Sequence, residues 1–123
     1  MACERSILAG GALTIDTNPT EIFNYPLPVG ASVDFDVKIV ARDVNDGSSA
    51  MWNKRACVKN VNGTVTLVGG AVDVLPARKE TASLTWNVTG AIVGDAISLS
   101  ATGGLGRDIQ WGVCAEALEM YNG

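Results

Sequence analysis

The side chains that could do acid–base chemistry in this chain are its closely spaced carboxylates. Asp34 and Asp36 are two residues apart, and Glu116 and Glu119 are three apart. Residues two apart on a strand point to the same face, so Asp34 and Asp36 are expected on a solvated face. We expect Glu116 and Glu119 to be surface or interface charges. The chain has no histidine, and therefore no usual general base and no Ser-His-Asp or Cys-His arrangement. The sequence predicts no catalytic residues and a protein that is not an enzyme.

Metal, phosphate and cofactor motifs are also incomplete. The segment 43–47 resembles a calcium loop, but its glycine comes one position too early for that motif. The segment 103–107, Gly-Gly-Leu-Gly-Arg, has neither the spacing nor the Lys-Ser/Thr of a phosphate loop, and we predict a turn there. A zinc site is not expected, because the chain has no histidine and no Cys-x-x-Cys pair. We predict no bound metal and no cofactor.

Tryptophans and cysteines are the remaining residues with distinctive chemistry. The tryptophans are Trp52, Trp86 and Trp111, and the cysteines are Cys3, Cys57 and Cys114. A sugar-stacking platform of the three indoles is one alternative, but each lies on the apolar phase of its expected strand, which favours core packing. The thiols are expected to be free and buried. A bridge between Cys57 and Cys114 would require their strands to be neighbours.

Composition limits the size and the partners of the protein. The chain has 123 residues, enough for one domain, and is 47% hydrophobic but only 18% charged, against about 25% charged in an average soluble domain. A monomer of this size exposes roughly 6,300 Å² of surface. Because so few charged residues are available to cover this surface, we expect self-association. The net charge of −4 disfavours nucleic acid as a partner. Lys54 faces opposite to Arg55 and Lys59 on a strand, so no basic stripe forms.

The chain shows no membrane or export signal. No apolar run approaches the ~18 residues of a membrane span. The first residues, Met-Ala-Cys-Glu-Arg-Ser, do not have the apolar core of a signal peptide. We therefore expect synthesis in a cytoplasm and no membrane partner.

Alternation of apolar and polar residues is the main structural signal. Ser32–Ile39 is the clearest case, with Val33, Phe35, Val37 and Ile39 on one face, as in a half-buried strand. Other expected strands are 13–16, 22–25, 52–59, 64–69, 72–75, 83–88, 96–102 and 109–120. Asn62-Gly63 indicates a hairpin with positive φ at both positions.

The second half of the chain, from Met51 to Glu119, resembles the small β-sandwich modules of tailed-bacteriophage virion proteins. The resemblance follows a sequence of elements: a Trp-led strand, a hairpin, Thr64–Gly69, Thr85-Trp86-Asn87-Val88, an alternating strand, the turn at 103–106 and Ile109-Gln110-Trp111. It implies architecture and a virion context, and it carries no catalytic residue.

Together these patterns predict an all-β fold: a two-sheet antiparallel β-sandwich, jelly-roll-like, with about eight strands. Residues 1–11 are expected to form an N-terminal arm, and residues 12–123 the sandwich domain. The arm contributes Ile7 and Leu8 as candidate contacts with the capsid or with a second subunit. The expected core residues are Phe35, Val37, Trp86, Leu99 and Trp111.

The main functional hypothesis is a bacteriophage capsid decoration, or cement, protein. It would bind the outside of the head shell as a homotrimer, with the major capsid protein as partner, after synthesis in the host bacterial cytoplasm. The resemblance, the low charge density and the missing catalytic set motivate this hypothesis. The alternative is a tail-fibre or receptor-binding tip module that recognises a host-surface glycan.

Overall fold

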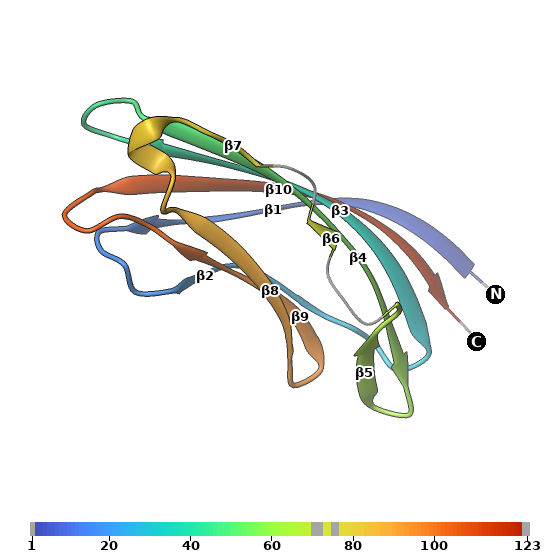
Figure 1. Ribbon diagram of the computed structural model, residues 1–123. Helices are drawn as coiled ribbons and strands as arrows, with labels where there is room; N and C mark the ends of the chain where they lie inside the picture. Colours follow the sequence, from blue (N-terminus) through green and yellow to red (C-terminus); the bar gives the residue numbers. More distant parts are fainter. Residues whose placement is uncertain (1, 70–72, 75–76, 122–123) are drawn as a thin grey trace.

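The chain folds into two antiparallel β-sheets packed face to face (Figure 1). The computed structural model describes residues 2–69, 73–74 and 77–121. Apart from one 3-10 turn, all regular elements of this described part are strands. The predicted all-β sandwich is therefore confirmed. The same part of the chain has no helix long and apolar enough to cross a membrane.

Four strands of 13 residues form the body of the larger sheet. In spatial order the sheet consists of β1 (Ala2–Thr14), β10 (Ile109–Tyr121), β3 (Ala31–Asp43), β4 (Ser49–Val61) and the shorter β5 (Thr64–Leu67). Two short strands, β6 (Asp73–Val74) and β7 (Arg78–Lys79), also pair with β4. Strand β1 thus lies at one edge of the sheet, and the short strands border β4 at the other.

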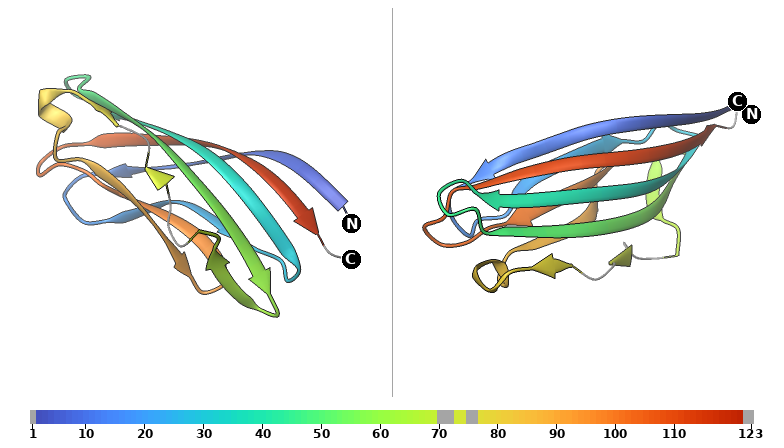
Figure 2. Two further views of the ribbon diagram at one scale, coloured as in Figure 1. Left: turned by 45° about the vertical axis from the view of Figure 1, so that its right-hand side comes forward. Right: turned by 90° about the horizontal axis from the view of Figure 1, so that it is seen from above.

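The smaller sheet covers one face of the larger sheet (Figures 1 and 2). It consists, in order, of β2 (Thr20–Pro26), β9 (Ala96–Thr102) and β8 (Asn87–Val93), and the 3-10 turn η1 (Thr81–Ser83) precedes β8. The chain changes sheet from β1 to β2, from β2 to β3, from β7 to β8 and from β9 to β10, as expected of a jelly roll. Strands β3, β4 and β5 instead follow one another within the larger sheet.

Strict alternation decides which side chains enter the sandwich. In β3, Val33, Phe35, Val37 and Ile39 are buried, while the residues between them face outward. Strand β10 repeats the pattern along its whole length, so the segment 115–120 is strand as predicted, despite its helical propensity. Burial of one sheet face against the second sheet outweighs this local preference.

The Asn62-Gly63 hairpin has the backbone that the sequence predicts. Both residues have positive φ, 54° and 90°, and they join β4 to β5. Such turns match the twist of the strands that they connect. The register of β5 on β4 therefore follows from this dipeptide.

The aromatic core lies between the two sheets. The ring centroids of Trp52 and Trp111 are 5.3 Å apart, and those of Trp86 and Trp111 are 6.4 Å apart. The Trp111 indole N–H donates a 2.9 Å hydrogen bond to Thr14 Oγ1, which connects the cluster to the end of β1. The five residues predicted for the core all lie in this one buried cluster: Phe35, Val37, Trp86, Leu99 and Trp111.

Residues 1–11 differ from the predicted arm. Strand β1 pairs with β10 from Ala2 to Thr14, so the described residues of this segment belong to the larger sheet. The strand period is hard to recognise because the inward positions carry small residues, among them Gly10 and Ala12. Gly10 is required for a steric reason, because a Cβ there would lie 2.4 Å from the Ile22 carbonyl oxygen of β2.

The predicted strand 83–88 begins later than expected. Residues 81–83 form η1, and β8 starts at Asn87. Trp86 and Val88 are buried, but Leu84 lies in the turn and is 62% exposed. Of the predicted strand 72–75, residues 73–74 form β6, and the rest lies outside the described residues.

Candidate functional site

The two carboxylate pairs have different environments. Asp34 and Asp36 lie on the outward face of β3, where Asp34 forms a 3.4 Å ion pair with Arg55. Glu116 also faces outward and forms a 3.0 Å ion pair with Arg5. The Glu119 side chain turns inward and is buried. The expectation of a surface or interface charge at Glu119 is therefore wrong, because positions three apart on a strand point to opposite faces.

Glu119 forms a buried polar contact with Tyr25. The Tyr25 hydroxyl donates a 3.0 Å hydrogen bond to Glu119 Oε2. Burial and then this carboxylate raise the pKa of Tyr25 to about 12, because both disfavour tyrosinate. The contact connects β2 of the smaller sheet to β10 of the larger sheet, so its role is structural.

The carboxylates of the segment 43–47 contact an arginine. Arg107 Nη1 lies 2.9 Å from Asp43 Oδ2 and 3.0 Å from Asp46 Oδ2. The two carboxylates raise the pKa of Arg107. The turn at 103–106 therefore brings a cation to these carboxylates. Among the described residues, no group of three or more His, Cys, Asp or Glu side chains is placed to bind a metal.

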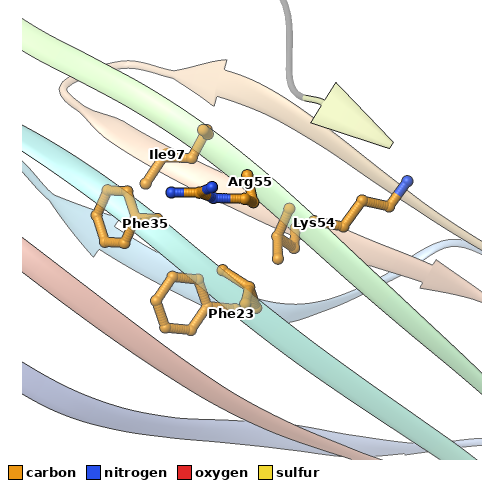
Figure 3. A pocket seen from close by; sticks show the side chains of 8 residues that line it. Phe23, Phe35, Lys54, Arg55 and Ile97 are labelled. Carbon is orange, nitrogen blue, oxygen red and sulfur yellow. The ribbon is translucent and has the colours of Figure 1, made fainter. Parts of the chain in front are cut away.

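A small hollow between the sheets is too narrow for a ligand. Phe23, Phe35, Ile97 and Leu99 contribute to its walls, and its volume of about 10 Å³ would hold about one water molecule. Lys54 also borders it, but its ammonium group points away from the phenyl rings (Figure 3). Burial, followed by the charge of Lys79, lowers the pKa of Lys54. The hollow is a packing defect.

Strand β3 separates Cys57 from Cys114. Cys57 on β4 lies opposite Asp34 of β3, and Cys114 on β10 lies opposite Lys38 of the same strand. Both are free thiols, and β4 and β10 are not neighbours, so a bridge between these residues is not formed. Burial raises the pKa of the Cys57 thiol. Cys114 is exposed on the outer face, which differs from the predicted buried thiol.

The face of the larger sheet that points away from the smaller one is the candidate interaction surface, and we call it the outer face. It carries seven large apolar side chains, 42–74% exposed: Ile7, Leu13, Val40, Met51, Val61, Leu118 and Met120. Gly11 and Gly112 are directly paired and leave a part of the face without side chains. Exposed apolar groups that share one flat face are typical of an interaction surface.

The predicted contact residues Ile7 and Leu8 point to opposite sides of β1. Ile7 is 74% exposed on the outer face, whereas Leu8 packs against the core. Alternation along the strand produces this separation. Contact of Ile7 with another chain stays a prediction, and Leu8 is positioned to stabilise the domain itself.

Two adjoining hollows lie where the outer face meets β7. Each has a volume of about 230 Å³, and both are lined by Met51 and Arg78. The first also includes Lys38, Val40 and Asn53. In the sequence, Lys38 and Arg78 lie far apart and in no recognisable motif. Only the pairing of β4 with both β3 and β7 brings these cations to one surface.

Comparison with known proteins finds this fold in bacteriophage tailspike proteins. No protein family and no curated protein matches the sequence. The Acinetobacter baumannii phage AM24 tailspike protein aligns with 98% of this chain and 27% of its own, with a TM-score of 0.58 and 9% identity. Tailspike protein gp49 from Acinetobacter baumannii bacteriophage Fri1, a capsular polysaccharide depolymerase, aligns with 93% of this chain and 17% of its own, with a TM-score of 0.51 and 14% identity.

The chain thus spans less than a third of each tailspike protein, and the sequence identities are low. At such identity the likeness concerns the fold alone, since one fold hosts many functions. The sandwich described above has the fold of a part of bacteriophage tailspike proteins.

Proposed function

We propose that this chain is a module of a bacteriophage virion protein of the tail-spike or tail-fibre kind, and that it binds a glycan on the host surface. The supporting observation is the alignment of nearly the whole sandwich with a part of two phage tailspike proteins. The outer face provides an exposed surface with apolar and charged groups for such binding. A module needs only a rigid sandwich and such a face, and both are present.

The tail position replaces capsid decoration as the main hypothesis. Both positions belong to the virion, and both were compatible with the sequence. The structural likeness supports the tail, because the proteins that share the fold are tailspikes. No observation on the described residues favours the head shell or a contact with the major capsid protein.

Glycan cleavage is not part of this proposal. The Fri1 tailspike protein is a capsular polysaccharide depolymerase, but this chain covers only 17% of that protein. The outward carboxylates Asp34 and Glu116 form ion pairs with arginines. That the chain is not an enzyme stays a prediction from its sequence.

Immunogold electron microscopy of purified phage particles tests the proposed position. Antibodies against the purified chain should label the distal part of the tail. Label spread over the head would contradict the proposal and support decoration. Pre-immune serum on the same particles is the control.

A further inference from the structure

Two cations on the outer face, Lys38 and Arg78, flank an apolar floor. We call the two cations and the residues between them the basic strip: Lys38, Val40, Met51, Asn53 and Arg78. Lys38 is directly paired with Asn53, Val40 with Met51, and Met51 with Arg78. These pairs share one face of the sheet, because directly opposed residues in antiparallel strands point the same way. The strip crosses β3, β4 and β7. The Cα atoms of its two cations are therefore two strand spacings apart across the sheet and two residues apart along it, which is roughly 12 Å in all.

The cations of the strip have no acidic partner within 4 Å among the described residues, unlike two other arginines of the outer face. Arg5 and Arg55 are paired with Glu116 and Asp34. Arg42, which follows Val40 by two residues on the same face, also lacks such a partner in the described chain. The outer face thus carries cations without an ion-pair partner among the described residues, on a protein whose net charge is −4.

Acidic groups also lie near the strip. Asp36 and Glu116 line a hollow together with Lys38, and Glu116 is already paired with Arg5. Glu80 lines the second hollow, but its Oε1 accepts a 2.8 Å hydrogen bond from the Ser49 N–H. Asp36 precedes Lys38 by two residues, yet the two do not form an ion pair within the described part of the chain. Lys38 and Arg78 are therefore available to an external anion.

The floor between the cations offers apolar contact and one unsatisfied acceptor. Val40 and Met51 are about half exposed, and the bare Gly112 backbone is paired with Val40. The Asn53 side-chain oxygen is shielded from solvent and has no hydrogen-bond donor among the described residues. A buried acceptor without a donor is destabilising, and a small side-chain rotation would let a hydroxyl group of a ligand supply the donor.

We infer that the basic strip binds an acidic saccharide, that is, a glycan segment carrying carboxylated sugars. Its carboxylates would accept hydrogen bonds from Lys38 and Arg78, its hydroxyls would donate to Asn53, and its C–H faces would lie on Val40 and Met51. Neutral glycans offer no charge for the two cations, and acidic peptides have few hydroxyl donors. This inference rests on the proposed glycan-binding function and specifies its ligand class and its surface.

Isothermal titration of the purified chain tests the inference with oligosaccharides of hyaluronan and of polysialic acid, and with dextran as the neutral probe. The chain should bind at least one acidic probe and not dextran, and its affinity should fall with added salt. The double variant Lys38→Ala/Arg78→Ala should lose at least about tenfold in affinity, equivalent to about 1.4 kcal/mol.

The control variant is Arg55→Ala/Lys59→Ala, which removes the same charge from the same sheet face outside the strip. It should keep its affinity within about twofold. Thermal unfolding of each variant checks that the fold is retained.

Several results would overturn the inference: no binding of either acidic probe, equal binding of dextran, equal losses in the two double variants, or equally tight binding of polyglutamate. A change of molecular mass in the strip variant would instead identify the strip as a contact between copies of the chain. Immunogold label on the tail together with failed saccharide binding would refute this inference and leave the tail position intact.

Discussion

Trp86 contributes to stability although it lies outside the strands. Its indole is fully buried against Trp111, and its carbonyl oxygen accepts a 2.6 Å hydrogen bond from Lys79 Nζ. We expect Trp86→Ala to lower the free energy of unfolding by about 3–5 kcal/mol, as measured by urea denaturation. Leu84→Ala, two residues away and exposed, is the control and should change it by less than about 0.5 kcal/mol. A Trp86→Ala protein of normal stability that fails to bind sugar would support the alternative of a sugar-stacking platform.

Tyr25 should make the protein sensitive to alkaline pH. Its pKa is raised to about 12 in the folded state, against about 10 in an unfolded chain. The folded state therefore keeps the proton between these values while the unfolded state loses it. The resulting stabilisation is complete below about pH 10 and is lost as the pH rises towards 12.

In the Tyr25→Phe variant, the free energy of unfolding should fall less steeply between about pH 10 and pH 12. Urea denaturation at a series of pH values measures this change. Tyr121, whose pKa the Glu119 carboxylate also raises, and Cys57, whose pKa burial raises, stay in place and contribute to the remaining slope. An identical decline in the variant would show that Tyr25 does not cause the pH dependence.

Individual residues were predictable where they follow the strand period. Phe35 and Trp111 are core residues for this reason, and Lys54 faces opposite to Arg55 as expected. Burial of Lys54 and Glu119 was not predictable, because charged residues are almost never fully buried unless paired. The basic strip depends on strand pairing between distant segments, which no local pattern specifies.

The close packing of β2 against β1 requires a residue without a side chain at position 10. A Cβ there would approach the Ile22 carbonyl oxygen to 2.4 Å, and neither backbone can move without disturbing its sheet. We expect Gly10→Ala to lower the midpoint of thermal unfolding, with a cost of about 1–3 kcal/mol. At Gly112 the nearest heavy atom would be 3.9 Å away, so Gly112→Ala should be tolerated. Equal stability of the two variants would argue against a steric role for Gly10.

Strand β1 also changes the expected effect of an N-terminal deletion. From the sequence, a chain lacking residues 2–9 should fold and only attach more weakly. In the structure these residues pair with β10 over Ala2 to Ala9, and Leu8 packs on the core. The deletion should therefore expose the edge of β10 and destabilise the whole domain.

Circular dichroism during heating measures this effect, with Ile7→Ala as a control that changes an exposed side chain and keeps the strand. An unchanged unfolding midpoint in the truncated chain would support the prediction from the sequence that these residues form an arm outside the domain. The strands with apolar alternation in the sequence were predictable: β9 at its true bounds, and β3 as 32–39 within the longer Ala31–Asp43. Strand β1 was not, because glycine and alanine at its inward positions remove the period that marks a strand.

At the scale of the whole molecule, the outer face combines two regions that adjoin at a hollow lined by both Ile7 and Lys38. The basic strip lies on the β3–β4–β7 side, and Ile7 lies on β1 at the opposite edge. The chain exposes 6793 Å², somewhat more than the roughly 6,300 Å² expected for its mass. Contact of a second subunit with the edge of β1 would leave the β4–β7 side of the strip, with Met51, Asn53 and Arg78, open to a saccharide.

We predict a homotrimer, formed through the β1 side of the outer face. Ile7 and Leu13 are exposed there, and within the described residues β1 pairs with one strand only, so a further strand could be added at this edge. Light scattering at micromolar concentration should give about three times the chain mass of 12.8 kDa. Ile7→Asp should shift the mass towards one chain, because it places a charge in the contact. Leu105→Asp, on an exposed loop, is the control and should leave it unchanged. A monomeric wild-type protein would contradict the inference that a surface with few charges implies self-association. A trimer whose mass does not change in the Ile7→Asp variant would show that the subunit contact does not involve Ile7 on β1.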